Sequence, residues 1–581
     1  MIASVAYESP LTRILRFDYR SGAALAYPGW GVETVGVTTT LGKVATRGGL
    51  TPVRRMGALA GVAAAALALG AAELVAVFTG SRSAPLVAVG GVVVDAVPAP
   101  VKQFAIDVFG RYDKIALLIG TAVLLAAFAA VIGLLAIRSM VAGYVGIAIF
   151  GVIGVAAAWT RPGAGPAAAL PALIGAALAA ALLHHLLRDV PRPGGDPAQA
   201  PAGSDPAQAP PGGDPAQARP GSGEFGDAGR RRLLTGAGIA LGVAAVGGLG
   251  GRWLSTRRGV SAARSEVILP NPASPAAPIP AGADLGLPRL APYTTPNSNF
   301  YQIDTALVVP QVDPTTWQLR IHGRVRDPIT LSFADLLARP MIERDITLAC
   351  VSNEVGGDLI GNARWLGVRI ADLLDEAGPL DGADQVVGRS ADGWTCGTPT
   401  AVLRDGRDAL LAVGMNGEPL PVEHGFPARV VVPGLYGYVS ACKWVVELEL
   451  TSFADFDAYW VPRGWSAEGP IKTQSRIDTP RPRNNPAAGP ITVAGVAWAQ
   501  HRGIQRVEVQ VDDGPWQPAT LAETVSIDTW AQWSWRWEAT PGEHTLRVRA
   551  TDASGAVQTE QRRPVEPDGA TGWHTVRLTV R

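Results

Sequence analysis

Apolar residues fill long uncharged stretches within the first 254 positions of the chain, separated by short polar or glycine-rich breaks. Each stretch holds about twenty residues, mostly Ala, Val, Leu, Ile and Gly, which is the length that an α-helix needs to cross about 30 Å of hydrocarbon. We expect membrane-spanning helices at residues 57–79, 115–137, 141–159 and 167–187.

Two further apolar segments fit this pattern less well. Residues 85–97 are short, contain Asp95 and run into Pro98, so we expect a re-entrant segment, an interfacial segment or a broken span. Residues 233–254 are rich in small residues and follow three arginines at 230–232. They resemble a twin-arginine export signal retained as an anchor, or they form an ordinary spanning helix with a basic flank.

The basic residues between these segments predict an orientation. Cytoplasmic flanks carry an excess of Lys and Arg, so the arginines at 230–232 are expected inside under either interpretation. If residues 85–97 do not cross, Arg138 and Arg188 lie inside as well. We therefore expect a multi-pass cell-membrane protein whose chain after about residue 255 lies on the extracytoplasmic side.

Proline-rich parts of the chain predict tethers. The hexapeptides GDPAQA, SDPAQA and GDPAQA recur around Asp196, Asp205 and Asp214, within a stretch rich in Pro, Ala and Gly at residues 189–229. Because this composition cannot bury a core, the stretch is expected to be a flexible linker. A second proline-rich stretch, residues 255–292, is expected to hold the following domain away from the last spanning helix.

Short alternating segments replace the long apolar ones after residue 292. Residues 317–323 and 445–450 alternate as strands do. Residues 332–337 have the pattern of a short helix with Ser332 as its N-cap. Asn416-Gly417 between apolar residues is a strong hairpin signal. This region is expected to be an α+β domain.

Strands separated by turn signals fill the last hundred residues, a pattern typical of a β-sandwich. They are expected at residues 491–498, 507–511, 533–537, 545–550 and 573–580. The whole chain is then read in the following order: an N-terminal tail (1–55, or a true start at Met56), transmembrane helices (56–188), a linker (189–229), an anchor (230–254), a second linker (255–292), the α+β domain (293–455) and the β-sandwich (484–581).

Composition narrows the function classes. The chain has 50 basic and 50 acidic residues, so its zero net charge gives no reason to expect a nucleic-acid partner. With 48% hydrophobic and only 17% charged residues it is too apolar for a wholly soluble protein, and a membrane is expected to be involved. Its cysteines, Cys350, Cys396 and Cys442, are three in number and lack CxxC spacing, which argues against a disulfide framework or a zinc ribbon.

One of these cysteines lies where chemistry is plausible. An apolar run ends at Cys350, and a polar, glycine-rich stretch containing Asn353, Glu354, Gly356 and Gly357 follows it. This pattern predicts a strand that delivers a thiol to the mouth of a loop. Taken alone, the stretch fits a buried structural thiol as well as a metal ligand.

Five motifs in matching order give the α+β region a resemblance to the sulfite oxidase superfamily of molybdopterin enzymes. They are TPNSNFY at 295–301, ACVSN at 349–353, NARWLGV at 362–368, MNGEPLPVEHGFPARVVVPGLYG at 415–437 and SACKW at 440–444. The resemblance covers roughly residues 293–452, and the HGFPAR block is specific. It implies a molybdenum–molybdopterin cofactor and two-electron oxygen-atom transfer on a small substrate of the sulfite or sulfoxide type.

The resemblance also assigns roles to residues. Cys350 resembles the thiolate ligand of the metal, a soft donor that suits molybdenum held by a pterin dithiolene. The phosphate of the pterin needs cationic donors, which His424, Arg429 and Lys443 could supply. Asn299 and Tyr301 are expected beside the cofactor, and Tyr301 and Gln302 join Cys350 in the catalytic set. Ser390, Ser440 and Ala441 are further cofactor-binding candidates, which align by position more than by type. Cys396 and Cys442 are read as structural.

Residues 484–581 resemble the immunoglobulin-like dimerisation domain that follows the molybdenum domain in this family, so a homodimer is expected. Trp530, Trp533, Trp535 and Trp537 lie close together in this sequence. Such a cluster fits a sugar-binding or interface surface, or a core that also packs against the neighbouring domain.

Departures from the family motifs bear on the substrate. Gln302 and Glu354 stand where sulfite oxidases have arginines, which weakens the case for an oxyanion; Arg364 or Arg404 could supply a cation instead. The sulfoxide-reductase branch has a glutamate where Ser352 stands and an asparagine where His424 stands. Neither branch fits fully.

No CxxCH motif accompanies this domain, and the adjacent His184 and His185 do not share a helix face, so no haem is expected in the chain. Electrons are then expected to pass through a separate partner. The alternative is a non-catalytic membrane receptor or assembly protein that keeps the fold, although such a protein has no reason to retain Cys350 beside His424, Arg429 and Lys443.

Overall fold

A computed structural model describes residues 52–97, 113–161, 164–188, 190, 227–257, 260–481 and 485–581. The expected N-terminal tail up to residue 51 and nearly all of the repeat-containing linker at residues 189–229 lie outside the described residues.

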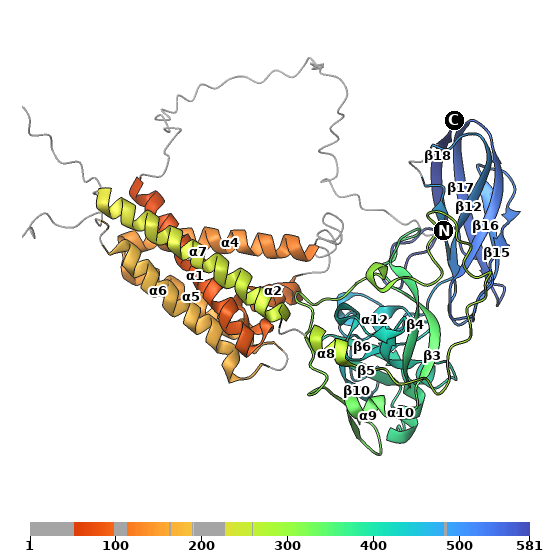
Figure 1. Cartoon of the computed structure of the whole chain (residues 1–581), viewed down its shortest axis with the longest axis horizontal. Coiled ribbons are helices and arrows are strands. Elements are labelled where there is room, and N and C mark those ends of the chain that lie inside the picture. The colour runs from red at the N-terminus through yellow and green to blue at the C-terminus, as the bar shows by residue number, and fades with distance from the viewer. Residues whose placement is uncertain are drawn as a thin grey trace, which may run out of the picture. The chain divides into compact units, whose positions relative to one another are not determined.

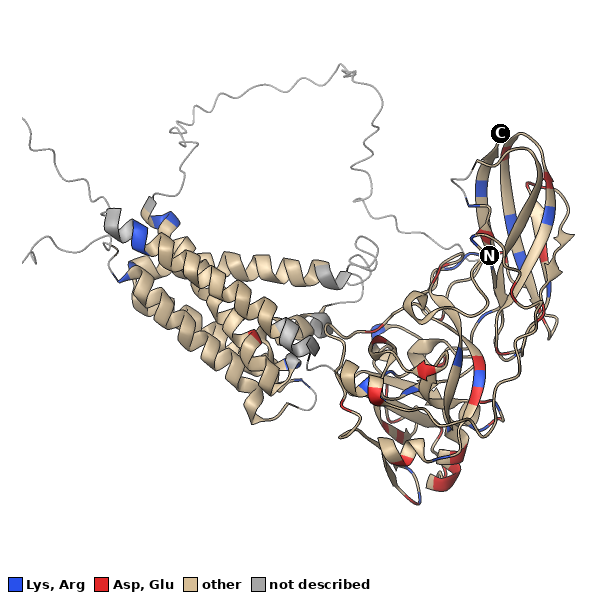
Figure 2. Ribbon diagram, in the orientation of Figure 1, with Lys and Arg blue, Asp and Glu red and all other residues tan. Residues whose placement is uncertain are grey.

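Apolar helices form the first part of the described chain (Figure 1). Five of them contain segments long and apolar enough to cross a membrane: Val53–Thr79, Ala116–Arg138, Met140–Trp159, Pro166–Leu187 and Arg231–Gly251. In Figure 2 the described lengths of these helices are almost entirely tan, whereas charged residues are spread over the strand-rich part. The helices are α1 (Pro52–Thr79), η1 (Ser81–Ser83), α2 (Pro85–Ala96), α4 (Asp113–Arg138), α5 (Met140–Trp159), η3 (Pro166–Ala169), α6 (Leu170–Leu187) and α7 (Asp227–Arg257).

Small residues allow close packing of these helices. A Cβ atom added to Gly61 of α1 would lie 2.0 Å from the carbonyl oxygen of Ala129 on α4. One added to Gly70 would lie 2.6 Å from the carbonyl oxygen of Ala244 on α7. Backbones approach this closely where glycine removes the side chain, as in membrane helix pairs. The segment at 85–97 forms the twelve-residue helix α2, which is too short to span.

Two sheets, the first mixed and the second antiparallel, build the next domain, which we call the mixed-sheet domain. One has the order β2-β1-β10-β5-β6, and the other has the order β3-β4-β7-β8 with β9 paired to β7. The strands are β1 (Gln318–Gly323), β2 (Ile329–Ser332), β3 (Ile342–Ala349), β4 (Ile360–Arg369), β5 (Gln385–Ser390), β6 (Thr395–Pro399), β7 (Leu410–Met415), β8 (Glu418–Pro419), β9 (Arg429–Val431) and β10 (Val445–Thr451). The helices are α8 (Ser261–Glu266), η6 (Asn297–Asn299), α9 (Phe333–Leu337), α10 (Ile370–Ala377), α11 (Thr400–Leu403), η7 (Val422–His424), α12 (Gly437–Ser440) and η8 (Val461–Arg463).

Local signals in the sequence explain several of these boundaries. Ser332 caps α9 in a capping box with Asp335, as its position in the sequence predicts. Asn416 and Gly417 have φ values of 52° and 82° and join β7 to β8 in the expected hairpin.

Two four-stranded sheets make up the C-terminal region, with orders β11-β12-β16-β15 and β14-β13-β17-β18. Trp533 and Trp537 are buried in their shared core with residues such as Val507 and Leu546. The tryptophan cluster is therefore largely core. The strands are β11 (Gln474–Thr479), β12 (Gly489–Trp498), β13 (Ile504–Val511), β14 (Gln517–Pro518), β15 (Thr520–Leu521), β16 (Ala531–Ala539), β17 (Gly542–Asp552) and β18 (His574–Val580).

The mixed-sheet domain and the C-terminal region share a buried contact at Trp530. Its indole N–H donates to the carbonyl oxygen of Tyr293 at 2.9 Å, and its backbone N–H donates to the hydroxyl of Thr347 on β3 at 2.8 Å. Trp530 also belongs to the hydrophobic cluster of the mixed-sheet domain. The two regions are thus joined by a continuous core.

The proline-rich stretch from 260 to 292, expected to be a linker, packs along this structure. The backbone of Ala273 and Ser274 bonds to β3 and the residue preceding it, and the Arg264 guanidinium donates to the carbonyl oxygen of Leu420 at 2.7 Å. Ala283 is fully buried in the core. This proline-rich segment is therefore extended but is not a free tether. Its backbone forms hydrogen bonds with the surface of the domain.

Truncation of Trp530 tests the shared core. We expect Trp530→Ala to lower the free energy of unfolding by about 3–5 kcal/mol, because a fully buried indole is replaced by a cavity. Calorimetry of the full-length protein in detergent should show a clear fall in Tm. Ile268→Ala, at a side chain that is 87% exposed, is the control and should stay within about 0.5 kcal/mol. Equal shifts in the two variants would contradict the shared core.

Candidate functional site

Cys350 lies directly after β3, at the base of a loop. Its backbone N–H donates to the carbonyl oxygen of Leu359 at 2.9 Å, which closes the loop over residues 351–358. The thiol is buried, and burial raises its pKa, while hydrogen bonds from the Ser352 backbone and hydroxyl and from the Val351 backbone oppose that rise. Burial is the largest of these effects and favours the neutral thiol, whereas the neighbouring donors would stabilise a thiolate if a metal were bound.

Tyr301 is a neighbour of Cys350. Its ring stacks on Phe300 with the centroids 5.1 Å apart. A Cβ atom built on Gly437, the first residue of α12, would lie 4.0 Å from the Tyr301 hydroxyl and 3.8 Å from the carbonyl oxygen of Ala349 at the end of β3. The pKa of Tyr301 is raised well above its usual value by burial and by the neighbouring Cys350, and Arg429 opposes the rise. Tyr301, Cys350 and Arg429 therefore form one cluster, in which the phenol keeps its proton at neutral pH.

Arg429 supplies a buried cation. It begins β9, and its Nη1 donates to the carbonyl oxygen of His424 at 3.1 Å while its guanidinium lies over the Trp365 ring, 5.0 Å from the centroid. Burial lowers its pKa to about 10, so it stays charged at neutral pH. Its buried Nε has no hydrogen-bond partner among the described residues. Such an orphaned donor on a buried charge is costly unless an anion or an acceptor occupies the site.

His424 is neutral in this environment. Burial, followed by the charge of Arg429, lowers its pKa to about 4. Its Nε2 lies 3.1 Å from the carbonyl oxygen of Asn297, and since a carbonyl only accepts, Nε2 carries the proton. The ring also packs edge-on against Phe300, with the centroids 5.6 Å apart. Asn297 escaped the sequence analysis because it acts through its backbone, which leaves no signal in residue type.

Lys443 is held by a partner that sequence reasoning also missed. Its Nζ lies 2.6 Å from Asp304 Oδ2 and donates to the carbonyl oxygen of Glu423 at 3.1 Å. Both side chains of the ion pair are largely buried. Asp304 offsets the charge of Lys443, so Arg429 is left as the cation whose donor is not satisfied.

The remaining candidates fall into two groups. Ser440 is buried in α12, but its hydroxyl donates to the carbonyl oxygen of Tyr436 at 2.9 Å, and Ala441 follows it. Ser390 is buried at the end of β5. By contrast, Asn299 and Gln302 are exposed: Asn299 accepts a hydrogen bond from Ser298, and Gln302 donates to Asp304.

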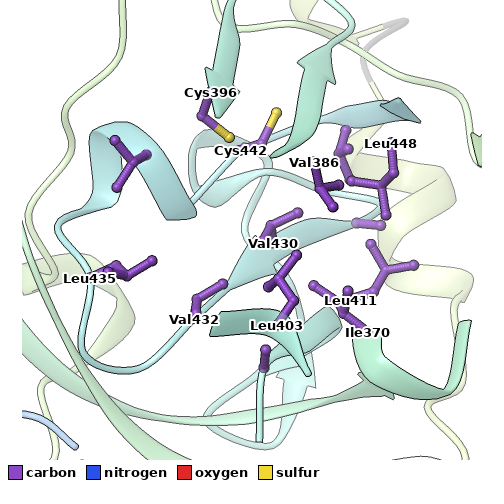
Figure 3. Packing of buried hydrophobic residues seen from close by; sticks show 14 of the residues in the cluster. Ile370, Val386, Cys396, Leu403, Leu411, Val430, Val432, Leu435, Cys442 and Leu448 are labelled. Carbon is purple, nitrogen blue, oxygen red and sulfur yellow. The ribbon is translucent and has the colours of Figure 1, made fainter. Parts of the chain in front are cut away.

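Two other features of the sequence have structural explanations. Cys396 and Cys442 are buried, and Figure 3 shows them packed with aliphatic side chains such as Val386 and Leu448, as the structural interpretation predicts.

The cations considered as substitutes for the missing arginines form ion pairs with other residues. Arg364 pairs with Asp345 at 2.7 Å, and Arg404 pairs with Asp375 at 2.7 Å.

The residues present fit a molybdopterin group. A buried thiol surrounded by donors suits a soft metal, and the unpartnered Nε of Arg429 suits an anionic phosphate. A chain of neighbouring groups links these residues. Tyr301 interacts with Cys350 and with Arg429, Arg429 donates to the carbonyl oxygen of His424, and the charge of Lys443 acts on the His424 ring.

Comparison with known proteins identifies relatives of this domain. The family model described as "Oxidoreductase molybdopterin binding domain" matches residues 306–460. Mitochondrial sulfite oxidase of Mus musculus is 31% identical over 341 residues, covering 50% of this chain and 62% of the relative, so the chain spans less than two thirds of that protein. Sulfite oxidase of Gallus gallus is 30% identical over 337 residues, covering 48% of this chain and 72% of the relative. The uncharacterised oxidoreductase YuiH of Bacillus subtilis is 35% identical over 183 residues, covering 31% of this chain and 88% of the relative.

These relatives and the converging side chains lead to one assignment: the chain belongs to the sulfite oxidase family of molybdopterin-dependent oxidoreductases.

Proposed function

We propose that this chain is a membrane-anchored molybdenum oxidoreductase that transfers an oxygen atom to or from a small sulfur compound. The observation that carries the proposal is the buried Cys350 thiol, which lies in one electrostatic cluster with Tyr301 and Arg429. Such a cluster suits a soft metal and an anion together.

Each residue of the cluster has a role in this proposal. Cys350 is the protein ligand of the metal, and Arg429 binds the phosphate of the cofactor through its free Nε, with Lys443 nearby. Neutral His424 offers Nδ1 as an acceptor, because its Nε2 proton is already donated to Asn297. When bound, the cofactor supplies a metal that changes its oxidation state by two. Tyr301 retains its proton and donates a hydrogen bond to an oxygen of the substrate.

Two substrate types are supported by different observations. The relatives named sulfite oxidase favour sulfite, which would take an oxygen atom from water and yield sulfate, two protons and two electrons. Two observations favour a neutral substrate. Gln302 and Glu354 occupy positions where sulfite oxidases have arginines, and Arg364 and Arg404 are held in ion pairs with other residues. A sulfoxide would take up two protons and two electrons and yield a thioether and water.

The five apolar helices support a membrane anchor, and the arginines flanking them support an extracytoplasmic catalytic domain. In both reactions the electrons pass through a separate partner protein. The C-terminal strands are proposed to form the immunoglobulin-like domain of the family and to mediate dimerisation.

Replacement of Cys350 tests the ligand role. We expect Cys350→Ser to lower turnover about 100-fold or more and to reduce the molybdenum content, since loss of a metal ligand exceeds the effect of losing its supporting residues. The assays are sulfite oxidation with ferricyanide and dimethyl sulfoxide reduction with reduced viologen. Cys396→Ser is the control and should retain both metal and activity. Wild-type protein without molybdenum, from cells that make the cofactor, would refute the enzyme and leave the receptor alternative.

Acidification tests the neutral state of His424. Its pKa is lowered in the fold to about 4, so between pH 6.5 and 4 the unfolded chain binds a proton that the folded chain does not. Stability therefore falls as the pH falls through this window, by about 2 kcal/mol at pH 5. Denaturant unfolding at pH 7 and pH 5 should show a smaller loss for His424→Gln than for the wild type. His574, whose pKa is also lowered to about 4, remains in both proteins and cancels. Equal losses would contradict this state of His424.

Reporter fusions test the orientation. Alkaline phosphatase fused after residue 260 should be active, and green fluorescent protein fused at the same point should be dark, because the fusion point is expected outside the cytoplasm. The opposite pair of results would overturn the extracytoplasmic placement. A fusion after residue 190, expected inside, is the matched control.

A further inference from the structure

The loop that follows Cys350 is held at its tip by the C-terminal sheets. The Arg476 guanidinium, on β11, donates from Nη1 to the carbonyl oxygen of Gly357 at 2.7 Å. His574, the first residue of β18, packs against Gly356 so closely that an added Cβ atom there would lie 2.3 Å from the imidazole Cδ2. Two side chains from the second region therefore fix the far end of the loop.

The loop is tied internally, so its tip and its base are coupled. The Asn353 side chain accepts the backbone N–H of Leu359 at 2.9 Å, and the backbone N–H of Asn353 donates to the carbonyl oxygen of Cys350 at 3.1 Å. The backbone N–H of Gly357 donates to the carbonyl oxygen of Glu354 at 2.8 Å. A displacement at Gly357 is therefore expected to move Val351 and Ser352, whose backbone and hydroxyl groups influence the pKa of the thiol.

Arg476 is itself rigidly oriented. Its Nε lies 2.6 Å from Asp478 Oδ1 and its Nη2 lies 3.3 Å from Oδ2, while the backbone N–H of Ala291 donates to the same carboxylate at 3.0 Å. Both side chains of this pair are about nine-tenths buried. Because Asp478 neutralises the guanidinium, its influence on the loop is positional rather than electrostatic.

His574 is fixed in the same way. The backbone N–H of Ile477 donates to its Nδ1 at 3.0 Å, which sets the ring plane facing Gly356. Gly356 has φ +82°, a conformation that favours glycine, and it also lacks the side chain that would collide with the ring. A glycine at position 356 of the loop is therefore required by the imidazole of His574 on β18.

We propose that Arg476 and His574 are positioning residues for the metal-ligand loop, so that the C-terminal region sets the hydrogen bonds received by the Cys350 sulfur. This rests on the proposed function, in which Cys350 is the metal ligand. Hydrogen bonds to a ligating sulfur tune the electronic properties of the metal, and a change in them alters the rate of the chemical step more than substrate binding.

The test uses full-length holoenzyme and Arg476→Lys. Lysine keeps the charge opposite Asp478 but lacks the planar fork that reaches both the carboxylate and Gly357. Arg536→Lys is the control, because Arg536 lies on β16 of the same region with an exposed side chain paired to Glu538. We expect Arg476→Lys to contain wild-type molybdenum, to lower kcat about tenfold with KM unchanged, and to shift the Mo(V) paramagnetic resonance signal. Kinetics use whichever of sulfite or dimethyl sulfoxide the wild type turns over.

Hydrogen exchange of residues 351–358 in cofactor-free protein gives a readout independent of activity. Exchange should be faster in Arg476→Lys than in the wild type or in Arg536→Lys. Unchanged exchange, resonance signal and kcat in a loaded Arg476→Lys protein would overturn the positioning role while leaving the proposed function intact. Absence of molybdenum from the wild type would instead refute the proposed function.

A second pair of variants approaches the same contact from the loop if Arg476→Lys does not fold. Gly356→Ala should shift the resonance signal and speed exchange, because the added methyl group collides with His574. His574→Ala in that background makes room and should restore part of both properties, the rest being lost to the strain of alanine at positive φ. No recovery in the double variant would contradict the role of His574.

Discussion

The site depends on one constraint: the positive charge of Arg429 is buried away from water. Arg429 is buried, stays protonated and has an Nε without a partner among the described residues. A buried cation of this kind is tolerated only where an anion completes its surroundings. Lys443 does not share this need because Asp304 already pairs with it. Among the described residues of the site, the need for an anion therefore falls on the Arg429 guanidinium, in one electrostatic cluster with the Cys350 thiol and the Tyr301 phenol.

Much of the architecture followed from local sequence signals. The five apolar helices, the capped start of α9 and the Asn416-Gly417 hairpin each depend on residues adjacent in sequence, so pattern alone indicates them. The buried cysteine, histidine and arginine were found through motifs that keep their residue types. The orientation of the helices in a membrane and the dimer stay predictions.

The contacts that escaped prediction share a physical reason. Asp304 and Lys443 lie 139 positions apart, so no local pattern links them. Asn297 acts through its carbonyl oxygen, and any residue type could provide one. The stretch from 260 to 292 has the composition of a tether, yet its backbone is bonded along the domain. Proline content reports an extended chain and does not report whether that chain is docked.

The Trp530 contact has a consequence for engineering. The indole is accommodated by Tyr293 and Thr347, which lie outside the C-terminal region. In a chimera whose last hundred residues came from a relative, the residues that contact position 530 would have to be replaced as well. Cutting the chain near residue 484 would likewise leave a hydrophobic socket open to solvent and invite aggregation. The two regions are better treated as one folding unit than as interchangeable modules.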